Sequence, residues 1–265
     1  MGDAVLRELD DEGVLLLTLN RPHKKNAFDD PQWDGLRDAL DEAREDPCVA
    51  AVVVTGAGDD FSAGQDLGAF GADDDSRDDG KPSGYFGCME ALVRFDKPLL
   101  AAARGVGVGI GATFLFHCDI VYVGESVRLR LPFVALGLVP EAASSYLLQQ
   151  VVGSRRAAEL FYTAEWIDAG RARDLGIAAG IFPDAQLLDA TLATAREIAQ
   201  YPVSSLQATK RTLMRVHREG IRAALDIEDE GMRQQAGSPE NVEAIRAFLE
   251  KRKPDFQQFR KRSDG

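Results

Sequence analysis

The sequence predicts an α/β protein in which strands and helices are mixed at first and helices alone follow. Short apolar or β-branched runs, which are typical of strands, all lie in its first half, and the segment after residue 142 has the three- and four-residue apolar spacing of helices. The chain has 265 residues, of which 45% are hydrophobic, so it can form a complete core as one large domain or two small ones.

Two strands are expected at the start of the chain, VLREL (residues 5–9) and VLLLTLN (residues 14–20). The turn DDEG between them makes a hairpin. A helix is expected next, with Asp30 as its N-cap, Pro31 in its first turn and Pro47 at its end. Its apolar residues lie three or four apart and so share one face: Trp33, Leu36, Leu40 and Ala43.

The middle of the chain predicts buried strands and one helix. Residues 50–55 (AAVVVT) and 99–103 (LLAAA) are apolar runs without alternation, which indicates strands buried on both faces. A helix over residues 87–96 is expected between them, and a further strand over residues 120–123 (IVYV). The acidic segment 73–80 cannot bury enough apolar surface to be ordered by itself.

Helices are expected from residue 142 to near the end of the chain. Ser154 and Asp168 are the expected N-caps of two of them, Gly176 follows the second, and Ser238 starts the last one. The longer helices are expected over residues 184–200, 203–218, 220–235 and 239–250. The last of these has an apolar face, so it either caps the core or packs on a partner.

The composition argues against several classes of function. A net charge of −12 repels phosphate backbones, so nucleic acid is not an expected partner. The three cysteines and three histidines are scattered without metal-ligand spacing, so no metal site is expected, and the odd cysteine count is typical of a reducing compartment. No apolar run reaches the about 18 residues of a membrane span, and no secretion signal opens the sequence. A soluble, cytoplasmic protein is therefore expected.

Two segments rich in small residues could present backbone N–H groups to a ligand. FSAGQDL (residues 61–67) follows a buried strand, and Asp66 could cap a helix there, although a plain connecting loop has the same pattern. Glycines alternate over RGVGVGIG (residues 104–111), which is a loose match to a dinucleotide fingerprint. Glycine also lets the backbone approach a ligand closely, so two such loops could instead form an oxyanion site.

Glu141, in VPEAA (residues 139–143), is the candidate general base and is expected at the start of a helix. Burial among apolar neighbours would raise its pKa, as a base needs, whereas the helix N-terminus would lower it. A solvated first-turn glutamate is the alternative interpretation. The motifs of serine hydrolases and of P-loop nucleotide enzymes do not occur, and His117 is expected to be a core residue.

In this order and spacing, the motifs resemble the crotonase family of enoyl-CoA hydratases and isomerases. The phrases that carry the resemblance are LNRPxxxNA (residues 19–27), FSAGxDL (residues 61–67) and CDI (residues 118–120). The resemblance implies a spiral of ββα units over residues 1–200 that holds the active site, and a C-terminal helical region over residues 201–265 for oligomerisation and part of the CoA pocket. It also implies an acyl-CoA substrate, a homotrimer or dimer of trimers, and neither a metal nor a redox cofactor.

The resemblance also implies roles for particular residues. The N–H groups of Ala63 and Ile110 would form an oxyanion hole, and Glu141 would be the catalytic base. The residues implied in binding the CoA thioester are Lys24, Lys25, Ala63, Gly64, Gln65, Asp66, Leu67, Gly109 and Phe133. The segment 72–80 and the helix over residues 87–96 would line the acyl end.

Departures from the family pattern favour one reaction. Hydratases carry two glutamates that hold water, and the matching positions here are Thr113 and Phe133, which cannot act as carboxylate bases. Glu141 looks like the single catalytic glutamate of the Δ3,Δ2-enoyl-CoA isomerases, and Ile110 replaces a glycine that is usual in hydratases. Arg104 stands where the family commonly has Asn, and no reason for it is evident. An isomerase is therefore favoured over a hydratase, another crotonase reaction such as thioester hydrolysis or decarboxylation, and a non-catalytic CoA-binding scaffold.

Overall fold

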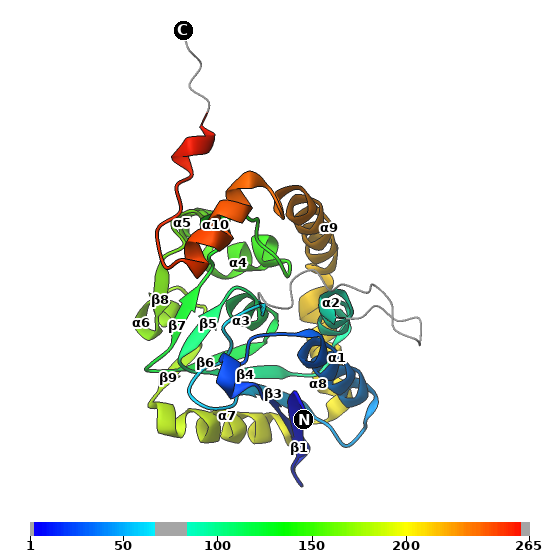
Figure 1. Ribbon diagram of the computed structural model, residues 1–265. Helices are drawn as coiled ribbons and strands as arrows, with labels where there is room; N and C mark the ends of the chain where they lie inside the picture. Colours follow the sequence, from blue (N-terminus) through cyan, green and yellow to red (C-terminus); the bar gives the residue numbers. More distant parts are fainter. Residues whose placement is uncertain (1–2, 67–83, 261–265) are drawn as a thin grey trace.

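A computed structural model describes residues 3–66 and 84–260 of the chain, and Figure 1 shows it as a layered α/β structure. Its larger sheet has six strands in the order β1-β2-β3-β4-β6-β9. These strands are β1 (Val5–Leu9), β2 (Val14–Leu19), β3 (Ala51–Gly56), β4 (Leu99–Ala103), β6 (Ile120–Gly124) and β9 (Gly180–Phe182). The expected hairpin is confirmed, because β1 and β2 pair antiparallel, and every other neighbour in this sheet is parallel.

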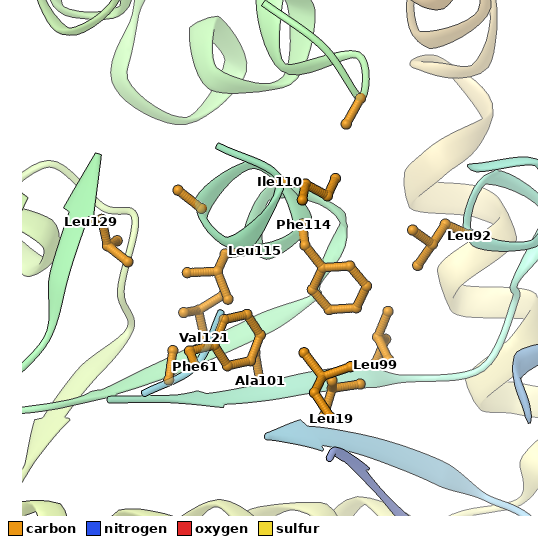
Figure 2. Close-up of a cluster of buried hydrophobic side chains, with 14 of the residues drawn as sticks. Leu19, Phe61, Leu92, Leu99, Ala101, Ile110, Phe114, Leu115, Val121 and Leu129 are labelled. Carbon is orange, nitrogen blue, oxygen red and sulfur yellow. The ribbon is translucent and has the colours of Figure 1, made fainter. Parts of the chain in front are cut away.

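The two central strands are buried on both faces, as their unbroken apolar sequences predict. Val53 and Leu100 pack against helix α7 (Asp184–Ala199), which runs along one face of the sheet (Figure 1). Val52 and Leu99 face the main core on the other side. Figure 2 shows part of that core, where Leu99 lies below Phe114, which projects from the short helical segment above the sheet.

A second sheet has the order β5-β7-β8 and was not expected from the sequence. Its strands are only three residues long each: β5 (Val106–Val108), β7 (Arg128–Arg130) and β8 (Trp166–Asp168). A three-residue strand is too short to show an apolar period, which explains the omission. The glycine-rich stretch therefore forms strand β5, followed by the short helix α3 (Ile110–Thr113).

Several helix boundaries differ from the expected ones. The N-cap of α1 (Asp30–Glu45) is Asp29, whose carboxylate accepts from the Gln32 N–H, so Asp30 is instead the first helical residue. Helix α2 (Gly84–Arg94) begins and ends earlier than the expected range 87–96. Ser154 is the first residue of α5 (Ser154–Thr163) and makes no cap bond, whereas Asp168 caps α6 (Ala169–Asp174) as expected.

The remaining helices follow the sequence pattern more closely. They are α4 (Ser144–Val152), α8 (Val203–Arg215), α9 (Arg218–Gln235) and α10 (Pro239–Leu249), with single 3₁₀ turns η1 (Pro22–Lys24), η3 (Phe114–His117), η4 (Val134–Leu136) and η5 (Gln257–Phe259). Ser238 caps α10 as expected. Helix α10 contacts η4, where the Asn241 Nδ2 donates to the Leu136 carbonyl, but Val242 and Leu249 of its expected apolar face stay exposed.

Among the described residues, no helix is long and apolar enough to cross a membrane. The expectations for Leu67 and for the acidic segment 72–80 lie outside the described residues. The division of the chain at residue 200 stays a prediction.

Candidate active site

A large open cleft of about 1800 Å³ collects most of the residues that the sequence singled out. It is lined by Ala63, Gly64, Gln65, Gly109, Ile110, Phe133 and Glu141. The cleft lining does not include Lys24, Lys25 or Asp66. The segments FSAGQD and RGVGVGIG and the residue Glu141 therefore meet in one place.

The two small-residue loops run side by side in parallel. The Ser62 N–H donates to the Val106 carbonyl and the Val108 N–H donates to the Ser62 carbonyl, both at 3.0 Å. A Cβ on Gly64 would lie 2.6 Å from the Val108 carbonyl oxygen, so only glycine allows this approach. Ser62 is in register with Gly107, and three residues further along each loop Gln65 and Ile110 both line the cleft.

The N–H group of Ala63 is not available to a ligand, which corrects the expectation from the resemblance. It donates to the Lys25 carbonyl at 2.8 Å, and the next N–H, that of Gly64, donates to the Ser62 Oγ at 3.2 Å. On either side of Gln65, the Phe28 N–H donates to the Gly64 carbonyl and the Asp66 N–H donates to the Phe28 carbonyl. The N–H of Gln65 therefore points away from Phe28. Within residues 3–66 and 84–260, no group accepts from the N–H of Gln65 or of Ile110.

Local structure holds these two N–H groups in place. Gly109, with φ 53° and ψ −123°, precedes α3 in a conformation that only glycine adopts readily, and so leaves the Ile110 N–H at the open start of the helix. The Ile110 side chain is buried in the core beside Phe114 (Figure 2). Gln65 is fixed through its side chain, because the Trp33 Nε1 donates to the Gln65 Oε1 at 2.9 Å.

Glu141 lies half-buried in the wall of the cleft. Burial raises the pKa of its carboxyl from 4.5 to about 8, and the negative charge of Glu228 acts in the same direction. The Thr113 hydroxyl opposes this rise, since it donates to the Glu141 Oε1 at 3.2 Å. Glu141 also precedes α4 by three residues instead of standing in its first turn, which corrects the expected helix start.

The two residues after Glu141 adopt left-handed backbone conformations that are unfavourable for alanine. Ala142 has a φ of 58° and Ala143 a φ of 54°. Each costs about 1–2 kcal/mol relative to ordinary backbone, so the surrounding structure must hold the turn. Three side chains do so: Tyr85 Oη accepts from the Ala142 N–H at 2.8 Å, the His117 Nε2 bonds the Ala142 carbonyl at 2.7 Å, and Glu228 accepts from the N–H groups of Ala143 and Ser145.

The two positions that carry water-binding glutamates in hydratases are filled differently here. Thr113 is fully buried and its hydroxyl is bonded to Glu141. Phe133 is buried at the edge of the cleft, with its ring centroid 6.2 Å from that of Phe161. Neither position therefore places a carboxylate in the cleft.

Other expected residues have structural partners. Lys25 pairs with Asp60 at 3.0 Å, Asp66 pairs with Arg21 at 3.0 Å, and Lys24 is exposed outside the cleft. The Arg104 guanidinium donates to the Gly58 carbonyl, so this residue fastens the turn that leads into the FSAGQD loop. In the described part of the chain, no three His, Cys, Asp or Glu residues are grouped to hold a metal ion.

Sequence reasoning missed Tyr85 and Glu228, both of which line the cleft. A signal for Glu228 exists, because it stands on the apolar face of α9. Ile221, Ala224 and Leu225 precede it and Met232 follows it at helical spacing. An acid at such a position is expected to be buried and to have specific partners.

The known proteins that this chain resembles share one family, but their names give different reactions. The family described as "Enoyl-CoA hydratase/isomerase" matches residues 10–260. The chain is 34% identical over 245 residues to the "2,3-dehydroadipyl-CoA hydratase" of Escherichia coli (strain K12), covering 92% of this chain and 94% of that protein. It is 31% identical over 258 residues to the "1,2-epoxyphenylacetyl-CoA isomerase" of the same organism, covering 93% and 95%.

A solved structure confirms the architecture. The crystal structure of an "enoyl-CoA hydratase/isomerase" from Pseudoalteromonas atlantica T6c has a TM-score of 0.89 and 35% identity, and the match covers 96% of this chain and 99% of that one. The crotonase fold predicted from the motifs is therefore confirmed.

Proposed function

The chain belongs to the enoyl-CoA hydratase/isomerase family, and from this premise we propose that it is a Δ3,Δ2-enoyl-CoA isomerase. The observation that carries the proposal is the placement of Glu141. Its carboxyl lies in the wall of the same cleft as Gln65 and Ile110, with a pKa raised to about 8. The two hydratase glutamate positions are occupied by Thr113 and Phe133. One base in the same cleft as two N–H groups that lack an acceptor in the described part of the chain supports a proton shift better than it supports the addition of water.

In the proposed mechanism, the thioester oxygen binds between the N–H groups of Gln65 and Ile110. These donors stabilise the dienolate that forms when Glu141 removes the C2 proton of a 3-enoyl-CoA. Glu141 then returns the proton at C4, so the double bond moves into conjugation with the thioester. Loss of one such donor typically costs about 100- to 1000-fold in rate, so both N–H groups are expected to matter.

The burial of Glu141 supports isomerisation over hydration. The raised pKa makes the carboxylate basic enough to remove a proton activated by the thioester. Phe133 and the bonded Thr113 leave no second carboxylate at the positions where hydratases hold water. Exclusion of water also protects the dienolate from side reactions.

The partners follow from the same proposal. Coenzyme A enters as part of the substrate, and the proton transfer uses only Glu141 and the two N–H groups, so no metal or redox cofactor is needed. Lys24, Lys25 and the segment from Ala63 to Asp66 are proposed to lie along the CoA. Lys25 would first have to leave Asp60 to reach a phosphate. A homotrimer or dimer of trimers in the cytoplasm is proposed on the family resemblance.

The test is Glu141→Gln, assayed with 3-hexenoyl-CoA. The substitution is expected to abolish isomerisation while leaving binding of the CoA thioester nearly unchanged, since glutamine keeps the shape but cannot accept a proton. Near-wild-type isomerisation by this variant would rule the assignment out.

Hydration is the second candidate reaction, because one of the two E. coli relatives is named as a 2,3-dehydroadipyl-CoA hydratase. A purified protein that hydrates 2-hexenoyl-CoA faster than it isomerises 3-hexenoyl-CoA would support it. A small panel of acyl-CoA esters separates thioester hydrolysis and decarboxylation by their products. A CoA-binding scaffold would bind acyl-CoA and show no exchange of C2 hydrogen with solvent deuterium.

A further inference from the structure

Glu228 is a buried carboxylate whose two oxygens both bind backbone N–H groups. It lies on α9 with 5% of its surface exposed. Its Oε2 accepts from the Ala143 N–H at 2.6 Å, and its Oε1 accepts from the Ser145 N–H at 2.8 Å. These two bonds tie both oxygens of Glu228 to the backbone that follows Glu141.

The peptide groups that Glu228 binds belong to the turn that carries Glu141. Ala143 is the N-cap residue of α4, and its methyl side chain cannot accept a hydrogen bond from the helix. Glu228 supplies the missing acceptor from a different helix, in the way that an Asp or Ser N-cap would within the same helix. Two N–H groups aimed at its oxygens also favour its ionised form, against the effect of burial, which raises its pKa.

The turn cannot keep its shape without such partners. Ala142 and Ala143 both have positive φ angles, and the first α4 N–H groups have no acceptor within their own helix. Release of the Ala143 N–H would let the turn relax towards ordinary backbone and would move the Glu141 carboxyl. A displacement of a reacting group by about 1 Å can cost about 100-fold in rate.

We propose that Glu228 is the positioning residue for Glu141: it fixes the turn that aims the base and, when ionised, places a negative charge beside it. The inference rests on the proposed role of Glu141 as the base. The charge disfavours ionisation of Glu141 and so makes it a stronger base when it is ionised.

Other groups around the turn do not supply this charge. Tyr85 from α2 and His117 from η3 bond Ala142, and Thr113 from α3 bonds Glu141. Burial raises the pKa of Tyr85 far above its usual value and lowers the pKa of His117 to about 4, so both side chains are neutral near pH 8. Besides Glu228, the charged residues of α9 that line the cleft are Arg218, Arg222, Asp226, Asp229 and Arg233. Of the charges around the site, Glu228 is the one that acts on the pKa of Glu141.

The experiment compares Glu228→Gln with Glu230→Gln, which is the same substitution at an exposed site on the same helix. In Glu228→Gln, an amide NH₂ replaces an oxygen that accepts a backbone N–H. We expect kcat for 3-hexenoyl-CoA to fall about 10- to 100-fold with little change in KM. The pH at which kcat/KM reaches half its maximum should fall, because removal of a negative charge lowers the pKa of Glu141. Glu230→Gln should match the wild type in all three quantities.

A measurement without substrate separates this inference from the proposed function. Titration of ¹³C-labelled glutamate carboxyls by NMR should show a lower Glu141 pKa in Glu228→Gln than in the wild type, whatever the reaction proves to be. An unchanged Glu141 titration together with unchanged kcat would overturn the role of Glu228. Absence of C2 deuterium exchange in the wild type would overturn the proposed function alone.

Glu228→Asp keeps the inference testable if the glutamine variant does not fold. The aspartate keeps the charge on a shorter side chain, so the Glu141 titration should stay near that of the wild type while kcat falls. A Glu141 pKa in Glu228→Asp that lies well below that of the wild type would contradict the effect of the charge.

Discussion

The N–H of Ala63 donates to the carbonyl oxygen of Lys25 at 2.8 Å, and for this reason the proposed oxyanion donor is Gln65. The bond ties the FSAGQD loop to the basic loop that precedes α1. The position that looks available from the motif is therefore part of the scaffold. The N–H two residues later, on the same loop and lining the same cleft, has no acceptor among the described residues.

Replacement of the Gln65 amide by an ester tests this assignment directly. The ester removes the N–H and keeps the side chain, so kcat should fall about 100- to 1000-fold. An ester at Ala63 removes the bond to Lys25 instead, and should lower the free energy of unfolding by about 1 kcal/mol with a much smaller effect on kcat. The opposite ranking of the two kcat values would restore Ala63 as the donor.

The pH dependence of kcat/KM should report the titration of Glu141. A base must be deprotonated to act, and the pKa of Glu141 is raised to about 8. Activity should therefore rise with pH and level off above about pH 8, as measured with 3-hexenoyl-CoA between pH 5 and pH 10. A profile already flat from pH 5 upward would show that the base is not a buried carboxyl with this pKa.

Glu141 should also make the folded state less stable as pH rises. The pKa of a glutamate carboxyl is ordinarily 4.5, and that of Glu141 in the folded protein is about 8. Between pH 4.5 and pH 8 the unfolded chain therefore loses a proton that the folded protein retains, and the free energy of unfolding falls. Glu141→Gln removes this penalty. The Tm of the variant should exceed that of the wild type at pH 8 and approach it at pH 5, as measured by calorimetry.

The same calorimetric comparison has a built-in control. Glu230→Gln changes an exposed carboxyl on α9 that does not line the cleft, so its Tm difference from the wild type should not grow with pH. A constant difference for Glu141→Gln as well would mean that Glu141 is solvated in the fold.

Apolar side chains exposed on the C-terminal helices predict self-association. Leu213, Val216 and Ile227 have 64%, 78% and 68% of their surfaces exposed. An aspartate at Leu213 or Val216 should weaken any subunit contact made there, because burial of an unpaired charge is costly. Sedimentation should give a trimer or hexamer for the wild type and smaller species for these variants. Tyr162→Asp on α5, at an equally exposed site, is the matched control.

Long apolar elements were predictable from the sequence, and short ones were not. Strands β3 and β4 are unbroken apolar runs, and their burial on both faces follows from that pattern. Strands β5, β7 and β8 have three residues each, and their pairing depends on residues distant in sequence. Only tertiary contacts define such strands.

Which segments form the candidate site was predictable from the sequence, but the hydrogen bonds within it were not. The glutamate and the two loops were identified from residue types, and the fold brings them into one cleft. Which N–H is free depends on the Lys25 carbonyl, a backbone group that carries no sequence signal. The helix expected at Glu141 begins later because Ala142 and Ala143 take left-handed conformations, which a run of alanines does not predict.

The bond between Ala143 and Glu228 also sets an order of events during biosynthesis. The two residues are separated by 85 positions, and Glu228 belongs to a helix near the end of the chain. A nascent chain emerging from the ribosome can complete the larger sheet, whose last strand ends at Phe182, before α9 exists. The turn that carries Glu141 then lacks its acceptor, so the proposed role of Glu228 predicts that activity appears only after α9 has docked.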